Sequence, residues 1–195
     1  MKQSVIVVGV STGAAPALQK VFAALPTEFV TPICVVAQLP GAFIAALCER
    51  LDRDCALDVA MASGDDVLTP GAIRFAPAGH HLHVSADSFG LGYTTSLAAP
   101  RQGYRPCVDV LFESAAATCG ARAIGVVLTG MGRDGCDGAR AIRAAGGRVI
   151  AQDQDTSAVW GAPGAVVRAS LANHVAPIEA IASKLCEWTM APANA

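Results

Sequence analysis

The sequence predicts an α/β fold, a doubly wound, mostly parallel sheet covered by helices, with a short antiparallel excursion at one edge. Three observations lead to this fold class. Uninterrupted β-branched runs alternate with amphipathic stretches over residues 5–51. Short strand-like pieces without an intervening helix fill residues 57–95, and the alternation returns from residue 108 onward. Continuous apolar runs are typical of strands buried on both faces by helices.

Each element rests on a local pattern. The runs VIVVGV and ICVVA predict buried strands, and the stretches after them have apolar residues at helical spacing. Between residues 57 and 95, Gly, Asp and Pro separate the short apolar pieces, which favours antiparallel strands. In chain order we expect strand 5–10, helix 15–25, strand 33–37, helix 43–51, strands 57–62, 72–76, 81–84 and 91–95, helix 108–119, strand 123–128, a glycine-rich loop 129–138 leading into a helix through 145, strand 149–151, helix 163–170, strand 174–175 and helix 178–186.

Composition narrows the class of protein. The chain has 195 residues, 53% of them hydrophobic and 15% charged, with a net charge of −2. We therefore expect one domain over residues 1–190 with a frayed tail at 191–195, and no nucleic-acid surface, which would need clustered Lys and Arg. No signal peptide and no long uninterrupted apolar stretch is recognisable, so we expect no membrane insertion. Seven cysteines without a CxxC pair indicate reduced thiols and a cytoplasmic protein.

The first strand runs into Gly9-Val10-Ser11-Thr12-Gly13, which matches the pattern G-x-S-x-G. A serine on a sharp strand-to-helix turn is exposed for nucleophilic attack, and helix N-terminal amides nearby can stabilise an oxyanion. The alternative is that Ser11 only caps the following helix. Nucleotide-binding motifs do not fit, because no Lys follows the glycines and the G-x-G-x-x-G spacing is absent.

The loop 129–138 carries four glycines around Asp134 and Asp137. Asp134 has the residue type that orients the histidine of a serine hydrolase. Both aspartates also suit the N-terminus of the next helix, where they would be purely structural. Since the carboxyl ends of parallel strands meet at one edge, we expect Ser11 and Asp134 to face a shared hollow.

The segment His80-His81-Leu82-His83 contains three of the four histidines. No partner motif of metal ligands accompanies it, so we predict no metal site and no cofactor. His81 is better interpreted as a residue of the cleft.

Taken together, the ordered segments resemble the catalytic domain of the chemotaxis protein-glutamate methylesterase (CheB) family over nearly the full chain. An unrelated α/β domain with chance matches is the alternative that the order of the segments makes improbable. The segments that carry the resemblance are V-G-V-S-T-G at 8–13, A-P-A-G-H-H at 76–81, R-P-C-V-D-V-L-F at 105–112, G-V-V-L-T-G-M-G-R-D-G at 125–135, and A-Q-D at 151–153 with T-S at 156–157 and G-A-P at 161–163.

The resemblance implies a serine hydrolase that removes methyl groups from methylated glutamates of chemoreceptors and deamidates glutamines. It implies Ser11 as nucleophile, Asp134 as triad acid, and Thr12 and Met131 as oxyanion or active-site contacts. Family members usually carry an N-terminal receiver domain; this chain begins at the first predicted strand, so we expect none here, and a separate receiver protein is a possible partner.

One departure bears on the chemistry. The family pattern after the second strand is Q-H-M-P-P-G-F, and its histidine is the general base. Alignment with one residue deleted places Leu39 opposite that histidine, and His81 is then the best substitute base. Two hypotheses remain: a methylesterase that uses Ser11 and Asp134, and a catalytically decayed module that binds a receptor or related signalling protein.

Overall fold

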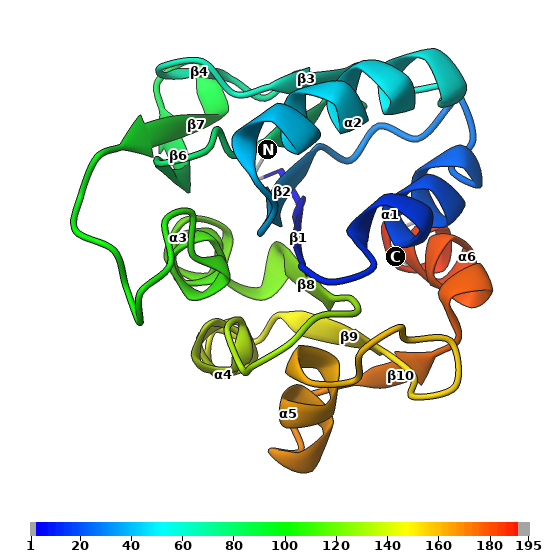
Figure 1. Ribbon diagram of the computed structural model, residues 1–195. Helices are drawn as coiled ribbons and strands as arrows, with labels where there is room; N and C mark the ends of the chain where they lie inside the picture. Colours follow the sequence, from blue (N-terminus) through cyan, green and yellow to red (C-terminus); the bar gives the residue numbers. More distant parts are fainter. Residues whose placement is uncertain (1–2, 191–195) are drawn as a thin grey trace, which may run out of the picture.

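The computed structural model describes residues 3–190 and confirms the predicted fold class (Figure 1). Seven strands form one sheet in the order β10-β9-β8-β1-β2-β5-β3, and all neighbouring pairs are parallel. Three further strands form a separate antiparallel sheet in the order β4-β7-β6. The predicted frayed tail, 191–195, lies outside the described residues.

The elements follow the predicted order with small shifts at their ends. Their bounds are β1 Val5–Val10, α1 Ala14–Ala23, β2 Ile33–Ala37, α2 Gly41–Asp54, β3 Val59–Met61, β4 Asp66–Val67, β5 Ile73–Phe75, β6 His81–Asp87, β7 Gly90–Ser96, α3 Val108–Cys119, a 3₁₀ turn Gly120–Arg122, β8 Ala123–Val127, α4 Cys136–Ala144, β9 Arg148–Gln152, α5 Ala162–Arg168, β10 His174–Ala176 and α6 Ile178–Met190.

Alternation along the central strands explains the two layers of helices. Ile6 and Val8 of β1 pack in the core beneath α1, α2 and α6, whereas Val5 and Val7 belong to the opposite core beneath α3, α4 and α5. All six residues of β1 are buried, which is why the sequence shows an uninterrupted apolar run there.

The antiparallel excursion is smaller than the sequence indicates. β3 and β5 pair in parallel at the edge of the main sheet, although no helix connects them. Ile73 and Phe75 are fully buried beside β2, so this edge is part of the core. The chain crosses between the two strands through β4 and its loops, a connection without helical periodicity that sequence patterns do not reveal.

The reversal of the strand order positions the site. The chain leaves β1 toward β2 on one side and returns through β8 on the other, so the strand order reverses next to β1. Ligands bind at the carboxyl ends of strands where such a reversal opens a crevice.

No helix within residues 3–190 has both the length and the apolar character needed to span a bilayer.

Candidate active site

Ser11 is the first residue after β1 and lies at the reversal of the strand order. Its backbone N–H donates to the Thr129 carbonyl oxygen at 3.0 Å, which joins this turn to the one after β8. A Cβ on Gly130 would lie 2.8 Å from the Ser11 Cβ, so the two turns approach this closely only with glycine. Gly13 has a φ of 87°, a left-handed conformation that glycine adopts without strain.

Ser11 and Asp134 line the same small cavity, together with Gln38 and Met131. The expectation that the two glycine-bordered turns converge is therefore confirmed. Ser11 follows β1, Gln38 follows β2, and Met131 and Asp134 share the loop after β8, so three loops at the carboxyl edge of the sheet build the cavity. The Ser11 hydroxyl makes no hydrogen bond with any residue that the structure describes.

Two backbone N–H groups next to Ser11 are free. Neither the Thr12 nor the Met131 amide finds an acceptor among residues 3–190. The Met131 side chain is 65% exposed at the rim of the cavity. Unpaired N–H groups beside a nucleophile are what an oxyanion hole requires. The oxyanion contacts that the resemblance implies for Thr12 and Met131 stay a prediction.

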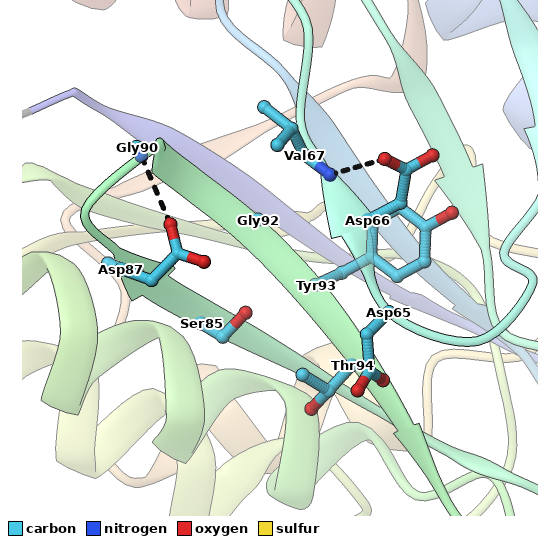
Figure 2. A pocket seen from close by; sticks show the side chains of 10 residues that line it. Asp65, Asp66, Val67, Ser85, Asp87, Gly90, Gly92, Tyr93 and Thr94 are labelled. Carbon is cyan, nitrogen blue, oxygen red and sulfur yellow. Dashed lines mark hydrogen bonds between the residues drawn. The ribbon is translucent and has the colours of Figure 1, made fainter.

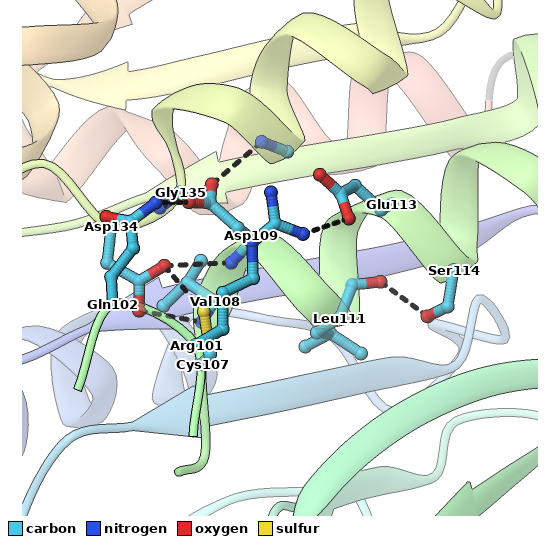
Figure 3. Close-up of polar contacts among 11 residues, drawn as sticks. Arg101, Gln102, Cys107, Val108, Asp109, Leu111, Glu113, Ser114, Asp134 and Gly135 are labelled. Atoms are coloured by element: carbon cyan, nitrogen blue, oxygen red, sulfur yellow. Dashed lines mark hydrogen bonds and ion pairs between the residues drawn. The ribbon is translucent and has the colours of Figure 1, made fainter. Parts of the chain in front are cut away.

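Asp134 is buried and accepts four hydrogen bonds. The backbone amides of Val108 and Asp109 donate to it at 2.9 Å each, and the Cys107 thiol donates at 3.1 Å (Figure 3). The fourth donor is Nε2 of Gln38, 2.6 Å from Asp134 Oδ2. All four partners are donors, and the two backbone amides belong to the first turn of α3, which Asp134 caps.

Gln38 follows β2, and its backbone N–H donates to the Val10 carbonyl oxygen at 2.9 Å, which fixes it beside the Ser11 turn. Since Nε2 faces the Asp134 carboxylate, the amide oxygen Oε1 is left as an acceptor for the cavity. Gln38 thus makes the contact with the acid that a triad histidine makes through its Nδ1–H.

Leu39 does not make this contact. Its side chain packs against the core on the α1–α2 side and lines an apolar hollow with Phe43 and Leu47. The side chain beside Asp134 is that of the preceding residue, because successive side chains at the end of an extended segment point in opposite directions. The prediction set Leu39 opposite the family's histidine with one residue deleted; alignment on Pro40 without a deletion sets Gln38 there, and the position of the Gln38 side chain beside Asp134 favours the second alignment.

His81, the predicted substitute base, is buried in β6 of the small sheet. Its Nε2 lies 3.2 Å from the Ala99 carbonyl oxygen, and its Nδ1 has no hydrogen-bond partner in the described chain. No hydrogen bond within residues 3–190 joins His81 to Ser11, Gln38 or Asp134. The structure therefore does not bring His81 to the position of a base.

Asp109 is a site residue that the sequence reasoning missed. Its Oδ1 accepts the amides of Gly135 at 2.9 Å and Gly138 at 2.7 Å, and Gln102 donates to Oδ2 at 3.3 Å (Figure 3). The two aspartates therefore cap each other's helices. Asp109, in the first turn of α3, caps α4, and Asp134, in the loop before α4, caps α3. Burial, followed by the nearby Asp134 charge, raises the pKa of Asp109 to about 6 even though the Gly138 amide opposes the shift.

Ligand atoms of Cys107, Asp109 and Asp134 lie within 4.8 Å of one another, a grouping that could suggest a metal. Burial above all raises the pKa of Cys107 to about 12, so its sulfur stays a protonated donor to Asp134. The carboxylates are occupied by backbone amides. Hydrogen bonds account for the whole cluster, and we derive no metal role from it.

A wider hollow of about 400 Å³ lies on the small sheet, away from Ser11 (Figure 2). Asp65, Asp66 and Asp87 line it, and each carboxylate accepts a backbone amide of its own loop or a neighbouring strand. These bonds shape turns. This hollow has no nucleophile with converging N–H donors, so the Ser11 cavity remains the candidate site.

Comparison with known proteins agrees with this geometry. The family model described as CheB methylesterase matches residues 6–185. A protein-glutamate methylesterase/protein-glutamine glutaminase of Nocardioides sp. is 46% identical over 173 residues, which are 89% of this chain and 47% of that protein. One from Alkalilimnicola ehrlichii is 38% identical over 182 residues, 93% of this chain and 47% of that protein.

The fold is similar to a solved structure as well. The crystal structure of the Thermotoga maritima CheB methylesterase catalytic domain matches with a TM-score of 0.93 and 34% identity, covering 96% of this chain and 99% of that one. The chain spans about half the length of the curated relatives it matches. By family model, sequence identity and fold, the chain belongs to the CheB methylesterase family.

Proposed function

We propose that the chain binds methyl-esterified glutamate side chains of chemoreceptors in the Ser11 cavity and hydrolyses them far more slowly than a Ser-His-Asp site does. Family membership supports the substrate class, since the relatives are named protein-glutamate methylesterases. The contact between Gln38 Nε2 and Asp134 Oδ2 at 2.6 Å supports the second part, because the side chain beside the acid is an amide and not an imidazole.

The first steps of ester hydrolysis are within reach of this site. Ser11 would attack the γ-carbonyl carbon, and the free amides of Thr12 and Met131 would receive the developing oxyanion. The serine proton must leave during the attack. Gln38 Oε1 can accept a hydrogen bond from the hydroxyl, but a carboxamide does not take up a proton at neutral pH, so no general base is available at that position.

The expected loss of turnover can be judged from serine protease triads whose histidine has been removed. Removing the histidine of a serine protease triad lowers turnover by about 10⁶, and the residual rate of about 10³–10⁴ over water comes from the oxyanion hole and binding. A site with Ser11, two free amides and Gln38 retains only that residual part. It keeps the ability to bind the ester.

A second candidate is a competent methylesterase that uses another base. It is favoured by the presence of Ser11 and Asp134 in one cavity with two unpaired amides. His81 would have to leave its contact with Ala99 to serve as that base. This candidate keeps the family activity in full.

Methanol release from methylated chemoreceptor membranes separates the two. We expect the wild-type chain to release methanol no more than a fewfold faster than Ser11→Ala does, and both proteins to pull down methylated receptor equally well within a fewfold. Release by the wild type that Ser11→Ala abolishes would establish the second candidate. Absence of receptor binding by both proteins would contradict the proposed function.

A further inference from the structure

Thr129, the second residue after β8, is buried and bonds to the Ser11 turn through two of its atoms. Its carbonyl oxygen accepts the Ser11 backbone N–H at 3.0 Å, and its hydroxyl Oγ1 donates to the Thr12 carbonyl oxygen at 2.9 Å. In Figure 1 the turn between β1 and α1 lies beside the loop after β8. These two bonds hold the peptide groups on either side of the Ser11–Thr12 peptide, to which the free Thr12 N–H belongs.

The Ser11–Thr12 peptide is also held at its own carbonyl group. The Ser11 carbonyl oxygen accepts the backbone N–H of Ala14, the first residue of α1, at 3.0 Å. In a trans peptide the N–H and the C=O point in opposite directions, so a fixed carbonyl also fixes the direction of the N–H. Hydrogen bonds to Thr129 and Ala14 therefore set the direction of the free Thr12 N–H.

The free Met131 N–H is fixed by a third segment of the chain. The carbonyl oxygen of its peptide group, that of Gly130, accepts the backbone N–H groups of Gly161 at 3.1 Å and Ala162 at 2.9 Å. The Gly130 N–H in turn donates to the Val159 carbonyl oxygen at 2.9 Å. The chain at the start of α5 therefore sets the direction of the Met131 N–H.

The Thr129 hydroxyl connects these two arrangements. Its oxygen accepts the Val159 backbone N–H at 3.0 Å. Its single proton goes to the Thr12 carbonyl oxygen at 2.9 Å, because the Val159 carbonyl oxygen is farther away, at 3.3 Å. The Thr129 backbone N–H donates to the buried Gln152 side chain at 2.8 Å. One hydroxyl thus joins the turn that carries Thr12 to the segment that holds the Met131 peptide.

From these contacts we infer that Thr129 is a positioning residue of the ester site. Its hydroxyl keeps the free N–H groups of Thr12 and Met131 in one mutual orientation, in which both donate to the carbonyl oxygen of a bound ester. The inference rests on the proposed function, in which these two amides receive the oxyanion. Donors that are fixed beforehand stabilise the developing charge without reorganising during the reaction. Thr129 itself does not line the Ser11 cavity, so it acts through the two amides.

Measurement of ¹⁵N relaxation on the substrate-free chain tests this orientation directly. Thr129→Val replaces the hydroxyl by a methyl group, and Thr129→Ser keeps the hydroxyl. In the wild type and in Thr129→Ser we expect order parameters of about 0.85 for the Thr12 and Met131 amides, as in rigid backbone. In Thr129→Val both should fall below about 0.6, the range of flexible backbone.

Thr118→Val is the matched control. The Thr118 hydroxyl also joins two elements, because it donates from α3 to the Val84 carbonyl oxygen of β6 at 3.1 Å, but it has no bond to the Ser11 turn. This variant should leave both order parameters unchanged. Thr129→Ala brings no methyl group toward the Thr12 carbonyl oxygen and replaces Thr129→Val if the latter does not fold.

Kinetics in the Gln38→His background measures the consequence for catalysis. Adding Thr129→Val should lower kcat for methanol release by about 10²-fold, the effect of losing an oxyanion donor, because the two amides no longer meet at the oxyanion. KM should stay within about threefold, because these bonds strengthen only in the transition state. Adding Thr129→Ser should leave kcat within about threefold of the Gln38→His protein.

The outcomes separate the inference from the proposed function. Rigid Thr12 and Met131 amides in Thr129→Val would overturn the inference and leave the proposed function standing. Flexibility of these amides in Thr129→Ser or Thr118→Val as well, or failure of both Thr129→Val and Thr129→Ala to fold, would assign Thr129 to general stability and also overturn it. A Gln38→His protein without turnover would count against the proposed function, and the order parameters would then decide the inference alone.

Discussion

The two sides of the Ser11 cavity differ in what they retain. On the nucleophile side, Ser11 is followed by Thr12 and lines one cavity with Met131, and neither backbone amide has an acceptor among residues 3–190. On the proton-transfer side, Asp134 keeps a short hydrogen bond, but its partner is Gln38. An amide in this position donates to the acid as an imidazole does, but it cannot take up a proton, and this difference is the basis of the proposed slow turnover.

This comparison shows why Asp134 has two separable roles. Three of its four donors, Cys107, Val108 and Asp109, belong to the start of α3 and do not depend on a triad. An aspartate that caps a helix is useful to folding even when no histidine is present. Its presence in the sequence is thus weak evidence for turnover.

The largest expected stability effect comes from the proton-transfer side. Asp134→Ala leaves the amides of Val108 and Asp109 and the Cys107 thiol without their acceptor in a buried position, and should lower the free energy of unfolding by about 3 kcal/mol or more. Ser11→Ala removes a hydroxyl that makes no hydrogen bond within residues 3–190, and should change it by less than about 0.5 kcal/mol. Urea unfolding measures both.

Equal losses in the free energy of unfolding for Asp134→Ala and Ser11→Ala would contradict the difference between the two sides of the cavity. Asp137→Ala serves as a control for charge, since Asp137 is on the same loop and pairs with Arg133 at the surface. It should lower the free energy of unfolding by less than about 1 kcal/mol.

The contact between the two turns gives the next effect. In Gly130→Ala the new Cβ would lie 2.8 Å from the Ser11 Cβ, and the backbone of the turn must shift to admit it. We expect a loss of about 1–3 kcal/mol in the free energy of unfolding, together with altered amide shifts at Ser11 and Met131. A variant with wild-type stability and unchanged shifts would show that the turns are not in contact. Ala42→Gly, at an exposed position near the start of α2, is the control, because it exchanges the same two residue types where no close contact exists. Gly103 is unsuitable as a control, because its φ of 84° would strain any other residue.

The buried Asp109 gives an effect that depends on pH. Its pKa of about 6 in the folded chain lies above the ordinary value of 3.8, so the folded state holds the proton more tightly than the unfolded state does. The contribution of Asp109 to stability is therefore greatest below pH 4 and is lost as the pH rises to about 6, by about 3 kcal/mol. Asp109→Asn has no such titration.

Urea unfolding at several pH values between 4 and 7 measures this difference. The free energy of unfolding of the wild type, relative to Asp109→Asn, should fall by up to about 3 kcal/mol across that interval. A constant difference between the two proteins would contradict a raised pKa at Asp109. The Asn side chain keeps Oδ1 as acceptor for Gly135 and Gly138, so the cap itself is preserved.

Local patterns predicted the parts of the fold that depend on neighbours in sequence. The runs of β1 and β8 are buried on both faces, and an apolar run alone signals that. The parallel pairing of β3 with β5 depends on a crossover without a helix, and the Asp109 cap joins residues 26 and 29 positions apart along the chain. Neither contact has a local signal.

The site was predictable to a similar extent. Ser11 and Asp134 each follow a strand that belongs to one parallel sheet, so their convergence follows from topology. The identity of the residue beside Asp134 depends on how the chain turns after β2. One deletion in the alignment exchanges Gln38 for Leu39, and the positions of the two side chains favour Gln38 as the residue beside Asp134.

A side-by-side measurement of methanol release by Gln38→His and Leu39→His tests the central claim most directly. With methylated chemoreceptor membranes as substrate, Gln38→His should raise the rate at least about 10³-fold over the wild type, because an imidazole at that position can bond to Asp134 and take the Ser11 proton. Leu39→His should leave the rate at background. A gain by Leu39→His without one by Gln38→His would contradict the assignment of Gln38 to the position of the base.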